Sequence, residues 1–158
     1  RFRIKTSELF ELVRDGRTTR GSWLFGSKPP ANDLLWQTIE AQGVKVWTFD
    51  RVRNREKEVD CAMCTEIGIR AARLHVAAIG EHDEAIKAKR ILKAAVFVVV
   101  SGDRDMLHTV KRVLSFGIAV ELWSWDNNCA GCYKELAING LPEADRDADH
   151  PGPAGRLL

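Results

Sequence analysis

The stretch AAVFVVVSGDRD, residues 94–105, joins the longest uninterrupted apolar run of the chain to two closely spaced carboxylates. An apolar run of this length is typical of a parallel strand that is buried on both faces of a sheet. Asp103 and Asp105 follow at the carboxyl end of that strand, where open α/β sheets place their ligand sites. The stretch therefore predicts an α/β fold with a functional site directly after the strand.

Helical and strand-like patterns alternate on both sides of this stretch. Besides the strand at 94–101, the patterns predict strands at 22–25, 44–49 and 118–125. They predict helices at 7–14, 33–42, 59–74, 84–93, 105–116 and 129–138. Strands separated by helices favour a parallel sheet with helices on both faces. We therefore expect a three-layer α/β/α domain with a mainly parallel sheet over residues 1–139, followed by a flexible, acidic C-terminal tail at 140–158.

The length and composition are those of an ordinary globular domain. The chain has 158 residues, of which 45% are hydrophobic and 29% charged, and its formal net charge is +2. It contains no run of about 18 apolar residues, so we expect no membrane span. The sequence starts at Arg1 rather than Met, which indicates a fragment or a processed form. We expect an intracellular protein, cytoplasmic or nuclear.

A third carboxylate, Asp60, opens the helix that follows the second predicted strand. The carboxyl ends of parallel strands meet at one edge of a sheet, so Asp60, Asp103 and Asp105 are expected together there. Carboxylates gathered in one place repel each other unless a cation neutralises them, and Mg²⁺ or Mn²⁺ suits such an all-oxygen site. The other interpretation is local: Asp103 caps the helix that starts near Asp105, and Asp105 complements the dipole of that helix.

A short basic segment precedes the third predicted helix. Four cations stand there against Glu56 alone: Arg51, Arg53, Arg55 and Lys57. A local basic patch attracts polyanions more directly than the net charge of a chain does. These side chains are therefore candidates for guiding a nucleic-acid backbone, and the alternative is that they are solvated loop residues.

The four cysteines form two C-x-x-C pairs, Cys61 with Cys64 and Cys129 with Cys132. Paired C-x-x-C motifs can hold structural zinc. The 64 residues between the pairs are far more than a zinc ribbon uses. Cys61 and Cys64 also fall in a helical pattern with small neighbours, where free thiols pack as small apolar groups. Whether the cysteines bind zinc stays open at this stage.

Three short motifs occur in a defined order along the chain. KEVD at 57–60 opens a helix, SGDRD at 101–105 follows the buried strand, and GIAVE at 117–121 leads into the last strand. In this order the motifs resemble those of the NYN domains, which belong to the PIN-like nucleases. The loop GSKPP at 26–30 resembles a eukaryote-type branch of that family. The resemblance covers residues 4–139.

The resemblance implies a metal-dependent RNA nuclease fold with a sheet ordered 3-2-1-4-5. It implies that Asp60, Asp103 and Asp105 are the catalytic, metal-coordinating carboxylates. Asp126 follows the last predicted strand at the same edge of the sheet and is a further candidate metal ligand. Lys28, in the GSKPP loop, joins the cations of the basic segment as an RNA contact. The family's first strand, which ends in a D-x-x-N motif, has no counterpart in this sequence. Its expected slot lies between the first and third visible strands, and either an upstream segment or another part of the chain would fill it.

The leading functional hypothesis is a divalent-metal-dependent ribonuclease, an endonuclease that hydrolyses phosphodiesters of single-stranded RNA with Mg²⁺ or Mn²⁺. The alternative is a catalytically degenerate NYN domain that acts as an RNA-binding or protein-interaction module, which the missing first-strand Asp favours. A D-x-D phosphatase or glycosyltransferase is disfavoured, because Met106 follows the motif and the strand comes late in the chain. A homodimer, or further domains of a longer parent protein, are the expected protein partners.

Overall fold

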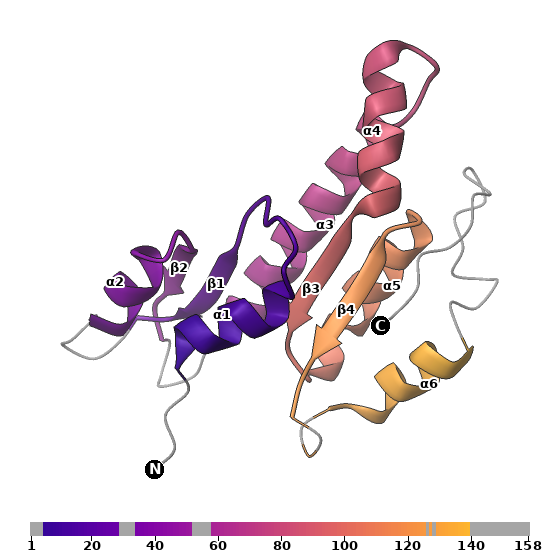
Figure 1. Cartoon of the computed structure of the whole chain (residues 1–158). Coiled ribbons are helices and arrows are strands. Elements are labelled where there is room, and N and C mark those ends of the chain that lie inside the picture. Colours follow the sequence, from indigo (N-terminus) through magenta and orange to yellow (C-terminus); the bar gives the residue numbers. More distant parts are fainter. Residues whose placement is uncertain (1–4, 29–33, 52–57, 126, 128, 140–158) are drawn as a thin grey trace. The chain divides into compact units, whose positions relative to one another are not determined.

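The structure, a computed structural model, describes residues 5–28, 34–51, 58–125, 127 and 129–139. Over these residues the chain is a mixed α/β protein with six α-helices, one short 3-10 helix and two small parallel sheets (Figure 1). The chain divides into two compact units, Arg1–Met63 and Cys64–Leu158. The predicted tail at 140–158 lies outside the described residues.

The first unit contains one strand–helix–strand element preceded by a helix. Its elements are α1 (Thr6–Arg14), β1 (Trp23–Ser27), α2 (Leu34–Glu40) and β2 (Lys45–Phe49). β1 and β2 pair in parallel, from Trp23 opposite Lys45 to Ser27 opposite Phe49. Parallel neighbours cannot be joined by a tight hairpin, so the chain crosses over through α2.

A close contact between α2 and β1 explains a glycine in the first unit. A Cβ atom added to Gly26 would stand 3.0 Å from Cη2 of Trp36. Because glycine has no Cβ, the indole ring of Trp36 can lie directly against the strand. Ile39, on the same helix, is 1% exposed and anchors α2 in the core of this unit.

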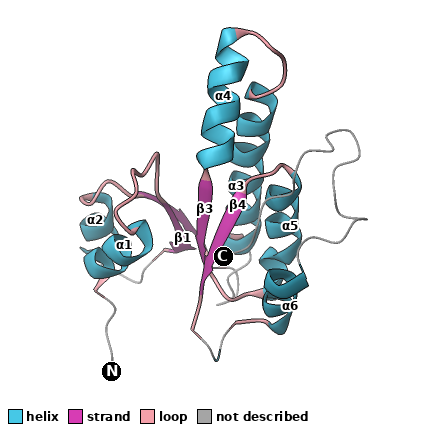
Figure 2. Cartoon of the chain, turned by 45° about the vertical axis from the view of Figure 1, so that its right-hand side comes forward, coloured by secondary structure: helices cyan, strands magenta, loops and turns pink. Residues whose placement is uncertain are grey.

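The second unit holds the remaining elements. They are most of α3 (Val59–Ala77), then α4 (Asp83–Ala94), β3 (Val96–Val100), the 3-10 helix η1 (Arg104–Met106), α5 (Leu107–Ser115), β4 (Ala119–Trp123) and α6 (Gly131–Asn139). β3 and β4 lie side by side and pair in parallel, from Val96 opposite Ala119 to Val100 opposite Trp123 (Figures 1 and 2). η1 and α5 form the crossover between them.

The apolar face of α5 forms the centre of the second unit. Val110, Val113 and Leu114 recur at helical spacing and are at most 2% exposed, as the sequence pattern predicts. Met106, directly before α5, is fully buried as well. α5 contacts β4, whose Val120 is also fully buried. This packing holds α5 against β4 and against η1, which ends the loop that follows β3.

Within the described residues, the parallel strands pair as β1 with β2 and β3 with β4. One expectation about the sheet needs correction. β3 is not buried on both faces: only Val99 is buried, and Val100 is 53% exposed. Among the described residues β3 pairs with β4 alone, so one edge of β3 is without a partner strand in this part of the chain. None of the described helices is long and apolar enough to cross a membrane.

The packing of α5 predicts a large difference between two truncations in the second unit. Leu114→Ala removes a side chain that is 1% exposed, and the cavity it leaves should lower the free energy of unfolding by about 2–5 kcal/mol. Ile138→Ala, at a position 83% exposed, should change it by less than about 0.5 kcal/mol. Urea unfolding followed by far-UV circular dichroism measures both, and equal effects would contradict the assigned core.

Candidate functional site

The loop after β3 carries the two carboxylates that the sequence singles out. Asp103 is the N-cap of η1, and its Oδ1 accepts a hydrogen bond of 3.0 Å from the backbone N–H of Asp105. The backbone N–H of Asp103 in turn donates to Oγ of Ser101 at 3.2 Å. Both carboxylates are solvent-exposed. The capping interpretation of Asp103 is therefore confirmed for one of its oxygens.

Residues that follow β4 hold the backbone of this loop in place. The carbonyl of Gly102 accepts a hydrogen bond of 3.1 Å from the N–H of Ala130. The carbonyl of Asp103 accepts a hydrogen bond of 2.5 Å from the hydroxyl of Tyr133 on α6. The loop with the carboxylates is thus tied at two consecutive carbonyls to the start of α6.

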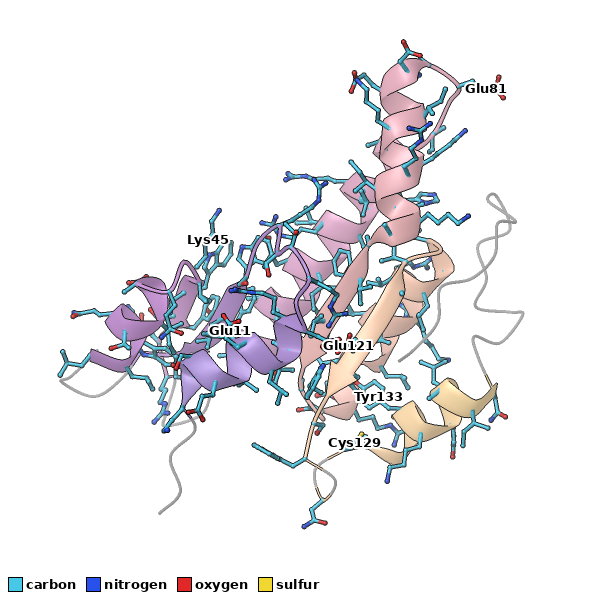
Figure 3. The ribbon with its side chains drawn as sticks, viewed as in Figure 1. Glu11, Lys45, Glu81, Glu121, Cys129 and Tyr133 are labelled. Carbon is cyan, nitrogen blue, oxygen red and sulfur yellow. The ribbon has the colours of Figure 1, made fainter. Side chains whose placement is uncertain are left out.

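Tyr133 is buried, and its surroundings keep its hydroxyl protonated. The residue is 2% exposed. Burial raises the pKa of the Tyr133 hydroxyl far above its usual value, and negative charge on Cys132 and Asp103 raises it further. Charge on Cys129 and Cys64 adds to the same shift in pKa. The phenol therefore acts as a hydrogen-bond donor at any physiological pH. Figure 3 shows Tyr133 on α6 and Cys129 just before that helix.

The role of Tyr133 could not be predicted from the sequence. Its partner is a backbone carbonyl 30 residues away, and carbonyls carry no residue-specific signal. The one available hint is that the only tyrosine of the chain directly follows the second C-x-x-C motif.

Asp60 lies in the first turn of α3, as the sequence predicts, and its side chain is exposed. It falls in the first compact unit, whereas Asp103 and Asp105 fall in the second. Among the residues that the structure describes, no group of three or more His, Cys, Asp and Glu side chains is placed to hold a metal ion. The structure thus brings Asp103 and Asp105 together in one loop, and a three-carboxylate site stays a prediction. Asp126 lies outside the described residues.

The predicted RNA-contacting cations are described only in part. Nζ of Lys28 lies 3.0 Å from Oδ1 of Asp50, and both side chains are more than half exposed. An exposed ion pair of this kind is weak, so Lys28 can readily leave Asp50 and bind another anion. Arg51 is also exposed. The other three cations of the segment lie outside the described residues: Arg53, Arg55 and Lys57.

Glu121, the acidic residue of the GIAVE motif, is half-buried on β4. Its Oε1 accepts a hydrogen bond of 2.5 Å from Nε1 of Trp123, two residues further along the strand. Residues at this spacing share one face of a strand. The contact fixes the Trp123 ring against β4, which is a structural role.

Comparisons with models of protein families, with curated proteins and with solved structures find no match to this chain. The interpretation of the site therefore rests on the motifs and on the geometry of the loop after β3.

The hydrogen bond from Tyr133 to Asp103 predicts the effect of a conservative substitution. Tyr133→Phe keeps the ring and removes the hydroxyl, and loss of this buried bond should cost about 1 kcal/mol. For a chain of this size the thermal midpoint should fall by about 2–4 °C. Differential scanning calorimetry measures the shift. Ser124→Ala removes an exposed hydroxyl and serves as the control, which should leave the midpoint unchanged. A midpoint unchanged in Tyr133→Phe would contradict the bond.

The raised pKa of Tyr133 also predicts a pH dependence of stability. The unfolded phenol loses its proton near pH 10.0, while the folded phenol keeps it to higher pH. The stability due to this group is therefore complete below pH 10.0 and declines as the pH rises beyond it. The stability advantage of the wild type over Tyr133→Phe should be constant up to about pH 9.5 and shrink between about pH 10 and pH 11.5 in urea titrations. An advantage that is constant over this range would contradict the shift.

Proposed function

We propose that the chain is a divalent-metal-dependent ribonuclease that cleaves single-stranded RNA internally, with Asp60, Asp103 and Asp105 as metal-holding carboxylates. The observation that carries the proposal is the exposed pair Asp103 and Asp105 at the carboxyl end of β3, on a loop that is tied to α6 at two carbonyls. Ligand sites of α/β proteins gather at that end of the strands.

The chemistry of these side chains suits Mg²⁺ or Mn²⁺. Both ions prefer carboxylate oxygens and water, and they are bound through a few carboxylates and a phosphate rather than by a complete protein cage. The hydrogen bond from the Asp105 N–H orients the Asp103 carboxylate and leaves its second oxygen available to a cation. Such outer contacts that orient a ligand raise metal affinity. When bound, the ion supplies charge neutralisation and an activated water for hydrolysis of a phosphodiester.

Asp60 enters the proposal through its motif and its position. It is the acidic residue of KEVD at 57–60, and it lies exposed in the first turn of α3. The role proposed for Asp60 is to supply a third oxygen ligand. The cations at positions 51–57, together with Lys28, are proposed to attract the RNA backbone, since neutralisation of phosphates dominates the affinity of nucleic-acid binding.

Substitution of the carboxylates tests the proposal. Asp103→Asn and Asp105→Asn should each lower the Mg²⁺- or Mn²⁺-dependent cleavage of a fluorescent single-stranded RNA by about 100-fold, which corresponds to about 2.7 kcal/mol in activation free energy. Asp83→Asn, at an exposed position in the first turn of α4, is the matched control and should cleave as the wild type does. Chelation of the metal should abolish cleavage. Activity that survives in Asp103→Asn would overturn the proposal.

A second candidate function is a binding module that lacks cleavage. Trp125, which follows β4, is 66% exposed and offers a ring on which a base can stack. This function is supported if the wild type binds RNA in a salt-sensitive way without cleaving it, and if Asp103→Asn binds equally well. Loss of binding in Trp125→Ala would then locate the surface that the RNA contacts.

A further inference from the structure

We propose that Cys129 and Cys132 form a reversible dithiol–disulfide site whose redox state is transmitted to the loop that bears Asp103 and Asp105. The proposal concerns the structure of the second unit, and it does not require that the chain be a nuclease.

The positions of the two cysteines favour a bond between them. α6 begins at Gly131, so Cys129 lies just before the helix and Cys132 lies in its first turn. Side chains of helical residues tilt toward the N-terminus of their helix, which directs the Cys132 thiol toward Cys129. A disulfide needs the two Cβ atoms about 4 Å apart. Cys129 precedes the first helical residue, so closure requires a local shift of the segment before α6 rather than of the helix itself.

The residues between the two cysteines can make this shift. Gly131 has open space around it, since a Cβ atom added there would meet no other atom within 4 Å. Both cysteines are free and half-buried, so their thiols are partly accessible to a small reagent.

The same short segment holds the loop after β3. Ala130, between the two cysteines, donates its N–H to the carbonyl of Gly102 at 3.1 Å. Tyr133, the residue after Cys132, donates its hydroxyl to the carbonyl of Asp103 at 2.5 Å. A disulfide would reorient the peptide units between the cysteines, and both hydrogen bonds start from that stretch or its immediate neighbour. The redox state of the pair therefore acts on the backbone of the carboxylate loop.

A third thiol lies in the same neighbourhood but is engaged elsewhere. Sγ of Cys64, on α3, lies 3.4 Å from Sδ of the buried Met106. This contact directs the Cys64 thiol to the far end of η1. The fourth thiol, Cys61, is exposed and falls in the first unit. The pair that is adjacent in sequence is therefore the one expected to close.

The reaction is an exchange with a small disulfide such as oxidised glutathione. One cysteine thiolate attacks a sulfur of the reagent, forms a mixed disulfide and releases the first thiolate of the reagent. The second cysteine thiolate then attacks the protein sulfur of the mixed disulfide and releases the second thiolate. In total the two cysteines lose two protons and two electrons, and the reagent is reduced to two thiols.

Thiol counting and peptide mapping of the whole chain test the bond. After equilibration with oxidised glutathione, two of the four thiols should be lost, and mass spectrometry should link Cys129 to Cys132. Cys132→Ser should stop at the mixed disulfide or at no reaction, with Cys132→Ala as the second variant if serine impairs folding. Cys61→Ser is the matched control and should oxidise as the wild type does. A link through Cys64, or zinc held by Cys129 and Cys132 in the purified protein, would overturn the proposal.

The only tyrosine of the chain reports on the transmission to the loop. With tyrosine labelled at Cζ by carbon-13, the protein gives a single resonance, from Tyr133. Oxidation should shift this resonance in the wild type, and reduction with dithiothreitol should restore it. Cys132→Ser should show no such shift under the same treatment. A disulfide that forms without any change at Tyr133 would refute the transmission, and neither result depends on cleavage of RNA.

Discussion

The carboxylate loop depends on two hydrogen bonds that its own residues cannot make. An exposed loop after an edge strand has few packing contacts to define it, and backbone carbonyls there are otherwise left to water. The N–H of Ala130 donates to the carbonyl of Gly102, and the hydroxyl of Tyr133 donates to the carbonyl of Asp103. These two bonds fix the start of η1. Tyr133 can do this because it is buried and stays protonated. The loop at the start of the β3–α5–β4 crossover is thereby stabilised by α6, which follows β4 in the chain.

Capping and cation binding are compatible roles for Asp103. Its Oδ1 accepts the N–H of Asp105, which is the usual task of an N-cap residue. A carboxylate has two oxygens, and fixing one of them sets the direction of the other. Asp105 lies on the same short turn, so the two carboxylates start from neighbouring backbone positions. A cation bound there would meet an Asp103 carboxylate that the backbone already orients.

Local patterns predicted the helices well, and non-local contacts were the source of the errors. The buried face of α5, with Val110 and Leu114, follows from helical periodicity, because residues at this spacing lie on the one side of α5 that packs against β4. The location of β3 could likewise be predicted from its apolar run. The burial of β3 could not be predicted, because the burial of a strand depends on neighbours that lie far away in sequence. For the same reason the carbonyl partner of Tyr133 could not be anticipated.

Residues far apart in sequence act on Tyr133 together. The 64 residues between the two C-x-x-C pairs are far more than a zinc ribbon uses. The fold nevertheless brings Cys64, Cys129 and Cys132 close enough to Tyr133 for their charges to raise its pKa. Cys64 contacts Met106 at the end of η1, and Cys132 precedes the tyrosine that binds the start of η1. Cys64 therefore contacts one end of η1, and the residue next to Cys132 holds the other end, which is the basis of the proposed coupling between oxidation and the loop that bears the carboxylates.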